Sequence, residues 1–411
     1  MVITVQPKGL QLQLEKELES LEIISCHEHH LIPEDGELVT LDYVFQNSYV
    51  GWCGEKLGKS VEEREFFIRR VGTNSYYRWL LSSLQKLYGF AGEIDAQNWD
   101  NISGRISEKH ASPDWYFTVL HEYGSIKRAI LDAYWDPGSN NGHPEVYFPT
   151  FRINALVMSH NPVVRDHNGN NAWELFSPYG MVPTNFSEYL EAIEALLTIK
   201  KNLGCVALKS ALAYDRTLTF DCPEKEDAEA VFNTEVDIYS PQAKAFQNYV
   251  FHFIVERAGE LGLPVQCHVG LGKLEGSNPM NLLPVIEKYP KTKFVLFHGG
   301  FPWVHEIGGL LHNYDNVYGD LVWLPLISPT AAIQGLHEWI EVARTSEKIT
   351  WGGDCWTPEE TYGAVLALRH VVARVLSEKI TEGYFSYQRA FELAQQIFST
   401  NALRLYRLEI E

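Results

Sequence analysis

Four short apolar runs of this chain each end in histidine or aspartate, and their positions limit the folds that the chain can adopt. The runs lie at residues 24–29, 264–268, 294–298 and 349–354, and they carry His27 and His29, His268, His298 and Asp354 in that order. Imidazole is the commonest protein ligand for zinc-like ions. Groups spread over more than 300 residues cannot form a metal site within one short segment, as a zinc finger does. They can meet only if the fold brings the ends of strands together, as the carboxyl rim of an α/β barrel does.

The order of apolar runs along the whole chain supports such a barrel. Runs that end in polar residues predict strands at residues 21–27, 129–135, 152–159, 205–211, 264–269, 293–298, 317–323 and 348–353. Amphipathic patterns predict helices at residues 186–203, 242–262, 281–289, 333–343, 358–378 and 385–397. Alternating strands and helices form a parallel sheet, and eight strands close it. The predicted fold is therefore α/β, a (β/α)8 TIM barrel.

One region is too long for a simple barrel connection. Residues 31–125 follow the first strand, where a crossover needs only about 20–30 residues. The segment is rich in aromatic residues and has helical patterns at 74–88 and 106–122. We predict a helical cap at 31–125, inserted into a barrel formed by residues 1–30 and 126–411. The cap is expected to set substrate choice without performing the chemistry, with His110 and His121 as helix-surface or packing residues.

Composition excludes several classes of function. The 34 basic and 53 acidic residues give a net charge of −19, and such a chain repels the phosphate backbone of nucleic acids. No run approaches 18 apolar residues, so no membrane span is expected, and the first residues do not resemble a signal peptide. The dispersed cysteines include Cys26 and Cys267, expected as reduced, buried thiols. A cytoplasmic enzyme with a small-molecule substrate is expected, and assembly into a homo-oligomer stays open.

The spacing of the first two histidines favours a shared ligand. His27 and His29 are two residues apart, so on an extended strand they point to the same face. The alternative pair, Glu28 with His30, would turn both of these histidines outward. Each later group also has a simpler interpretation: His268 and His298 could be core histidines that bond backbone carbonyls, and Asp354 could cap the helix that begins near residue 358.

Five further residues are candidates for substrate binding. Lys209 ends the predicted fourth strand, and Arg152 and Arg216 could hold a substrate carboxylate or form surface ion pairs. Tyr134 and Trp135 end the predicted second strand, where they could line a pocket or simply pack.

Longer segments around the strand ends resemble a known family. Residues 263–272, 294–303 and 351–361 look like the amidohydrolase-related family of the amidohydrolase superfamily, particularly the amidohydrolase half of nodulin/glutamine-synthetase-like fusions. Residues 401–406 match the family's terminal helix, and residues 77–80, 88–89 and 98–99 are similar to the cap of uronate isomerases.

The resemblance implies roles for the strand-end residues. His27, His29 and His268 would be metal ligands, Asp354 a ligand and proton shuttle, and His298 a second ligand or a substrate contact. In binuclear members a carboxylated lysine on the fourth strand bridges two metals. We favour substrate binding by Lys209, and hence one ion rather than two.

These observations predict a metal-dependent hydrolase that uses a divalent ion, expected to be zinc, to activate water. Asp354 would accept the water's proton, and His298 would polarise the scissile carbonyl in place of a second metal. The bond that breaks would be a C–N or C–O bond of a small polar molecule. The alternatives are an aldose–ketose isomerase similar to uronate isomerases, a metal-dependent decarboxylase, and an inactive barrel that acts as a scaffold.

Overall fold

Eight strands follow one another around a single sheet in chain order in the computed structural model, which describes residues 7–34, 36–54 and 56–409. The strands are β1 (Ile23–Glu28), β2 (Ile126–Leu131), β3 (Tyr147–Arg152), β4 (Ala207–Ser210), β5 (Val265–Cys267), β6 (Phe294–Leu296), β7 (Val317–Asp320) and β8 (Ile349–Thr350). All neighbouring pairs from β3 to β8 are parallel. Helices alternate with these strands, so the predicted (β/α)8 TIM barrel is confirmed.

The register of the strands aligns their carboxyl ends. Ser210 is opposite Cys267, and Cys267 is opposite Leu296. His268 and His298 follow these positions by one and two residues, so both lie just beyond the same edge of the sheet. The sequence pattern of apolar runs ending in polar groups therefore marked the correct end of these strands.

Two predicted strands were misplaced. The second strand is β2, Ile126–Leu131, which overlaps the predicted range of 129–135 only at residues 129–131. The third strand is β3, and the predicted range of 152–159 instead holds α7 (Asn154–Met158). A short apolar run cannot be assigned to strand or helix by periodicity alone, and Pro149 within β3 argued against a strand there. Arg152 accordingly ends the third strand rather than starting it.

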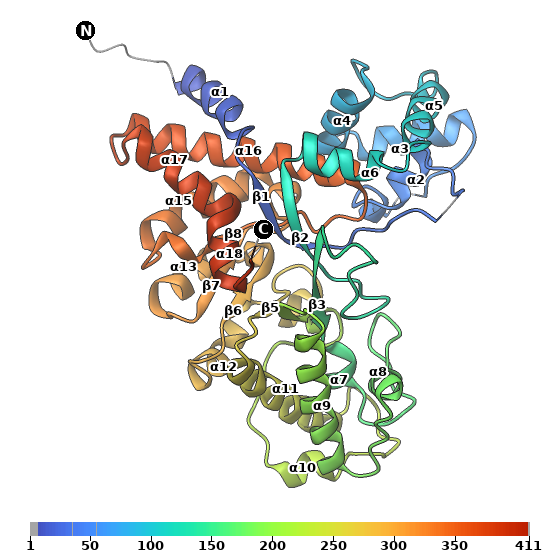
Figure 1. Ribbon diagram of the computed structural model, residues 1–411, viewed down its shortest axis with the longest axis vertical. Coiled ribbons are helices and arrows are strands. Elements are labelled where there is room, and N and C mark those ends of the chain that lie inside the picture. The colour runs from blue at the N-terminus through green and yellow to red at the C-terminus, as the bar shows by residue number, and fades with distance from the viewer. Residues whose placement is uncertain (1–6, 35, 55, 410–411) are drawn as a thin grey trace. The chain divides into compact units, whose positions relative to one another are not determined.

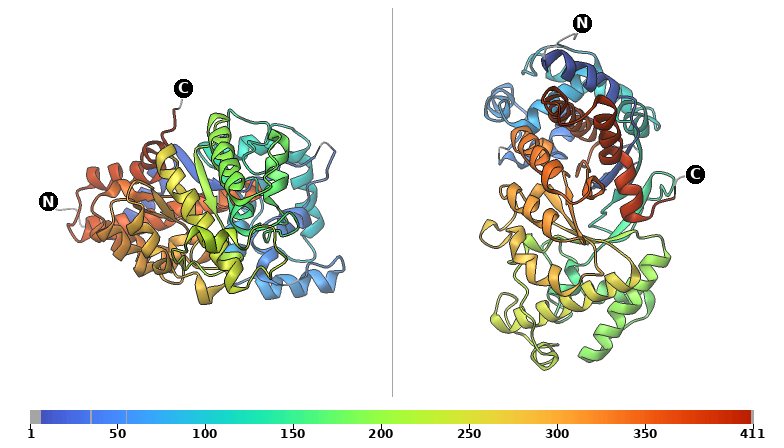
Figure 2. Two further views of the ribbon diagram at one scale, coloured as in Figure 1. Left: turned by 90° about the horizontal axis from the view of Figure 1, so that it is seen from below. Right: turned by 90° about the vertical axis from the view of Figure 1, so that its left-hand side faces the viewer.

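The chain divides into two compact units, and each is described by itself. Unit 1 contains the described residues of 1–129, 321–337 and 351–400. Its helices are α1 (Pro7–Leu18), α2 (Leu41–Gln46), α3 (Val61–Val71), α4 (Ser75–Tyr88), α5 (Trp99–His110), α6 (Trp115–Thr118), α14 (Leu324–Ile327), α16 (Pro358–Thr381) and α17 (Tyr387–Gln395). The long helix α16 packs against α1 and α4 (Figure 1 and Figure 2). α15 (Pro329–Val342) follows α14 along the chain.

The region after β1 is helical, as predicted, and has its own apolar core. Phe45 of α2 contacts the rings of Phe67, Tyr77 and Trp99, with centroids 5.6, 6.1 and 5.5 Å away. The single helix predicted at 106–122 is instead divided, since α5 ends at His110 and α6 begins at Trp115. Pro113 lies between them, and a proline disfavours the helical conformation of the residue before it. The predicted division into a barrel and a cap at 31–125 differs from the two compact units and stays a prediction.

Unit 2 contains the described residues of 130–320, 338–350 and 401–411. Its helices are α7, α8 (Ala172–Phe176), α9 (Phe186–Asn202), α10 (Lys225–Glu229), α11 (Pro241–Leu261), α12 (Leu283–Lys288), α13 (Val304–Asn313) and α18 (Asn401–Tyr406). α11 packs against α7 and α9 (Figure 1). Gly262 ends α11 with φ +69°, a conformation that favours glycine, and this end was predicted. In the described part of the chain, no helix is both long and apolar enough to span a membrane.

Candidate active site

Within unit 1, three buried groups could hold one metal ion. His27 lies on β1, His29 follows the strand directly, and Asp354 lies in the loop after β8. Their candidate ligand atoms all lie within 4.8 Å of one another. Asp354 Oδ1 is 3.5 Å from His27 Nε2 and 3.3 Å from His29 Nε2. Ligands about 2.1 Å from an ion at tetrahedral angles are about 3.4 Å apart, so these side chains fit a zinc-like ion.

The loop that carries Asp354 has an unusual backbone conformation. Asp354 has φ +63°, in the left-handed region, and its N–H donates to the carbonyl of His27 over 2.9 Å. The interpretation of Asp354 as a helix cap is wrong, because the side chain of Thr357 caps α16 by accepting from the N–H of Glu360. The carboxylate of Asp354 is therefore available to His27 and His29.

Glu28 fixes this loop from β1. Its Oε1 accepts from Ser25 Oγ (2.6 Å) and the N–H of Gly353 (3.0 Å), and its Oε2 accepts from the N–H of Cys355 (2.9 Å). A Cβ at position 353 would lie 2.5 Å from Glu28 Oε1, so the close approach requires glycine. The carboxylate thus holds the residues on both sides of Asp354.

His30 does not join the candidate ligands. Its Nε2 lies 2.9 Å from Thr361 Oγ1 and 3.4 Å from Glu28 Oε2, and both side chains of this pair are fully buried. Glu28 and His30 are therefore supporting groups, and the structure agrees with the prediction that His30 points away from His27 and His29.

Tyr49, which the sequence analysis did not single out, is bonded to Asp354. Its hydroxyl donates to Asp354 Oδ2 over 2.5 Å, and its ring stacks on Trp323 with centroids 4.3 Å apart. Trp356 lies against the same tyrosine ring and stacks on His29 at 5.4 Å. Tyr49 belongs to the helical region after β1, so this region contributes a residue to the candidate site. Its partner is 305 residues away, and no local sequence pattern marked it.

Two acidic residues at the start of α16 differ in charge. Burial raises the pKa of Glu360 to about 8, and its Oε1 accepts from the N–H of Tyr49 over 2.6 Å. Burial also acts to raise the pKa of Glu359, but the hydrogen bond and charge of His110, 2.7 Å away, lower it overall. His110 is thus paired with a buried carboxylate rather than lying on a helix surface. His121 faces the carbonyl of Ile126 at 2.8 Å, a packing role.

Within unit 2, the two later histidines bond each other. His298 Nε2 lies 2.8 Å from His268 Nδ1, and His268 Nε2 makes a very short contact with the carbonyl of Leu271. A carbonyl can only accept, so His268 Nε2 is the donor in its contact with Leu271. The role of His268 as a third metal ligand rests on the sequence and stays a prediction, as does the role of His298.

Among the predicted substrate-binding residues, Arg152 has a buried partner. Its Nε and Nη2 donate to Asp132 Oδ2 over 3.0 and 2.5 Å, and its Nη1 donates to Asn168. Burial lowers the pKa of Arg152, but the charge and hydrogen bonds of Asp132, with smaller contributions from Asp166 and Tyr214, together raise it overall. Arg152 is therefore not a surface ion pair, and its guanidinium contacts the ring of Tyr134 at 5.2 Å.

The remaining candidates differ in burial. The ammonium of Lys209 is buried and lies 4.1 Å from the ring centroid of Phe297. Arg216 is also buried and donates to the amides of Gln247 and Asn248, so the alternative of a surface ion pair is wrong here too. Trp135 is 42% exposed, so it does not serve as core packing.

Comparisons with known proteins point to one superfamily. The model of the amidohydrolase family matches residues 235–408, which include His268, His298 and Asp354. A segment of 151 residues is 34% identical to Protein fluG of Emericella nidulans and covers 35% of this chain and 17% of that protein. A segment of 254 residues is 23% identical to a uronate isomerase of Caldanaerobacter subterraneus and covers 59% of this chain and 52% of that enzyme. The matches thus span about half or less of each relative.

Solved structures share the fold over nearly the whole chain. The glucuronate isomerase of Caulobacter crescentus aligns with a TM-score of 0.76 and 16% identity, covering 100% of this chain and 96% of that one. A protein of Lactobacillus casei described as a metal-dependent hydrolase aligns with a TM-score of 0.70 and 18% identity, covering 97% and 99%. The resemblance predicted from the sequence is confirmed, and the structures establish the fold.

Proposed function

We propose that this chain is a metal-dependent enzyme that hydrolyses a C–N or C–O bond of a small polar molecule. The observation that carries this proposal is the buried group of His27, His29 and Asp354, whose ligand atoms lie within 4.8 Å of one another. Two imidazoles and a carboxylate are a donor set that zinc prefers. The amidohydrolase family match over residues 235–408 supports the same chemistry.

His27, His29 and Asp354 would hold the ion, with His268 as the predicted third imidazole. A divalent ion in such a site polarises a substrate oxygen and lowers the pKa of water from 15.7 to about 7. The residues of this chain then position groups and move protons around it. His29 is held against the indole of Trp356, which restricts its orientation.

Asp354 is the group that would accept and return a proton. Its Oδ1 faces the two histidines and its Oδ2 accepts from Tyr49. The hydroxyl of Tyr49 fixes the rotation of the carboxylate, so that Oδ1 keeps its position. The stacked rings of Tyr49 and Trp323 exclude water from the Oδ2 side.

A second candidate is an aldose–ketose isomerase that acts on a uronate, and the contact between Tyr49 and Asp354 favours it. Isomerisation requires a proton to leave one carbon and another proton to reach the neighbouring carbon. A hydroxyl and a carboxylate joined by a 2.5 Å hydrogen bond can hold and exchange one proton. The similarity to uronate isomerases is in keeping with this alternative.

Metal content and substrate screening test both candidates. Protein never exposed to chelator should contain about one divalent ion per chain. Asp354→Asn keeps the shape but not the proton acceptor, so kcat should fall by at least ~10²-fold. The same metal analysis on His268→Ala tests its predicted ligand role. Mass spectrometry of products separates the candidates, because hydrolysis adds one water and isomerisation leaves the mass unchanged. Metal-free protein whose activity resists chelation would refute the proposal.

A further inference from the structure

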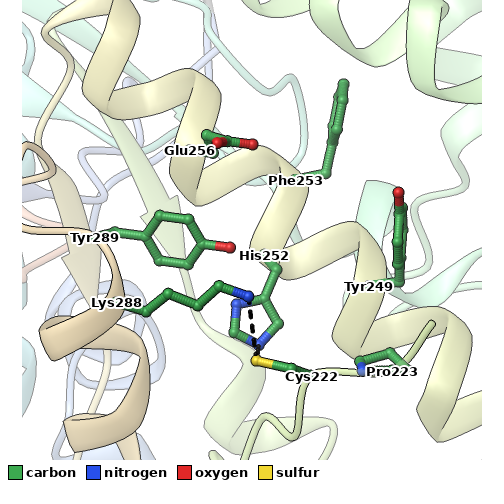
Figure 3. A pocket seen from close by; sticks show the side chains of 8 residues that line it. All are labelled: Cys222, Pro223, Tyr249, His252, Phe253, Glu256, Lys288 and Tyr289. Carbon is green, nitrogen blue, oxygen red and sulfur yellow. Dashed lines mark hydrogen bonds between the residues drawn. The ribbon is translucent and has the colours of Figure 1, made fainter. Parts of the chain in front are cut away.

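A second group of reactive side chains lies in a cavity of unit 2, on elements that carry none of the candidate ligands. The cavity has a volume of about 360 Å³. Figure 3 shows its lining: Cys222, Pro223, Tyr249, His252, Phe253, Glu256, Lys288 and Tyr289. Cys222 lies in the loop before α10, His252 on α11 and Lys288 at the end of α12. Three separate elements therefore bring a thiol, an imidazole and an ammonium together.

Both nitrogen groups approach the sulfur of Cys222. Lys288 Nζ donates to Cys222 Sγ over 3.2 Å, and His252 Nε2 lies 3.5 Å from the same sulfur (Figure 3). Burial lowers the pKa of Lys288, but the hydrogen bonds and charges of Cys222 and Tyr289 together raise it overall. Lys288 is therefore a cation beside the sulfur at neutral pH.

The surroundings of His252 determine which of its nitrogens carries the proton. Nε2 lies 3.3 and 3.2 Å from the carbonyls of Phe220 and Asp221, which can only accept. Nε2 is therefore the protonated nitrogen, and it presents an N–H toward Cys222 rather than a lone pair. In the described part of the chain, the buried Nδ1 has no hydrogen-bond partner, as expected for a neutral imidazole. Burial and the charge of Lys288 both lower the pKa of His252, in keeping with this form.

Cys222 thus accepts a hydrogen bond from a cation, Lys288, and faces the N–H of His252, which the two carbonyls share. A nearby cation and N–H groups stabilise the negative charge of a sulfur that reacts as a nucleophile. The thiolate is the form of cysteine that attacks electrophiles, and Cys222 is exposed to solvent. The other cysteines offer a contrast, because Cys53 is half-buried and Cys26, Cys205, Cys267 and Cys355 are buried.

We propose that Cys222 is a modification site that forms mixed disulfides with small organic disulfides. The Cys222 thiolate attacks one sulfur of the reagent, a new S–S bond forms, and the original S–S bond breaks with release of the second half as a thiolate. No proton or further oxidant is needed. The cavity favours an organic reagent, since it has the size of a small-molecule site and aromatic walls from Tyr249, Phe253 and Tyr289.

The test is the rate of mixed-disulfide formation with oxidised glutathione at neutral pH, measured by mass spectrometry of the intact chain and its peptides. We expect one rapidly modified residue, Cys222, with Cys53 at least ~10-fold slower because its thiol is half-buried. Cys222→Ser should abolish the rapid phase. Similar rates at Cys222 and Cys53 would overturn the proposal.

Variants of Lys288 test the role of the cation. Lys288→Gln removes the positive charge 3.2 Å from the sulfur and should lower the rate of mixed-disulfide formation about threefold. Lys288→Arg should restore the rate, and Lys291→Gln, at an exposed lysine outside the cavity, should not change it. An unchanged rate in Lys288→Gln would contradict the assigned role of Lys288.

Discussion

Replacing Glu28 by glutamine tests whether its carboxylate positions Asp354. In the structure both oxygens accept: Oε1 from Ser25 and Gly353, and Oε2 from Cys355. Glutamine retains one acceptor and turns the other into an N–H donor. The less costly orientation of the glutamine amide places its oxygen where Oε1 was, which keeps the contacts with Ser25 and Gly353. Its NH2 group then faces the buried N–H of Cys355, which is also a donor.

The cost follows from these contacts. A hydrogen bond to a charged group contributes about 1.5–3 kcal/mol, and a buried N–H left without an acceptor costs about 1–3 kcal/mol. The two terms overlap, so Glu28→Gln should lower the free energy of unfolding by about 2–4 kcal/mol. The loop around Asp354 loses one of its two anchors, and zinc affinity should fall about 10–100-fold, as for other groups that orient metal ligands.

Competition with a chromogenic chelator measures the apparent dissociation constant for zinc, and urea unfolding followed by circular dichroism measures stability. Glu360→Gln is a matched control, because the pKa of about 8 keeps Glu360 mostly protonated at neutral pH. That substitution exchanges one neutral group for another and should leave zinc affinity nearly unchanged. Wild-type zinc affinity and urea resistance in Glu28→Gln would refute the positioning role.

Two further predictions concern the neighbours of Asp354. Tyr49→Phe keeps the ring stacked on Trp323 but removes a hydrogen bond to the carboxylate of Asp354, which contributes about 1.5–3 kcal/mol. The substitution should lower kcat about 10–100-fold without changing the fold. An unchanged kcat would show that the hydroxyl is dispensable. The pKa of Glu360 is about 8 in the folded protein, well above its usual value of 4.5. Between these two pH values the folded state binds a proton that the unfolded state does not, so the free energy of unfolding falls as pH rises from 4.5 to 8. Urea unfolding at pH 5 and pH 8 should show a smaller decline for Glu360→Gln, and equal declines would contradict the buried, neutral carboxyl.

Features with a strong periodic pattern could be predicted from the sequence. The helices α9 and α11 were predicted to within a residue or two, because their apolar stripes and end signals agree. The two-residue spacing of His27 and His29 predicted that both side chains share one face at the end of β1, and both lie beside Asp354. These inferences needed only local geometry and the topology of a parallel barrel.

Features that depend on distant partners could not be predicted in this way. Leu156-Val157-Met158 is apolar enough for a strand, but tertiary packing makes it α7. Tyr49 and Arg152 each have partners that only the folded chain reveals, namely Asp354 and Asp132. A single tyrosine among the many aromatic residues after β1 carries no mark of such a contact.

The dependence of β1 on the far end of the chain also sets an order of events during synthesis. Cys26 and His29 donate to the carbonyls of Trp351 and Cys355, so this strand lacks these partners until the chain is nearly complete. At about 5–20 residues per second, a ribosome needs about 16–65 s to proceed from His29 to Asp354. During that interval the nascent chain presents two histidines without their carboxylate. We therefore expect metal binding at this site to be a late event, which follows the meeting of the first and last strands rather than nucleating it.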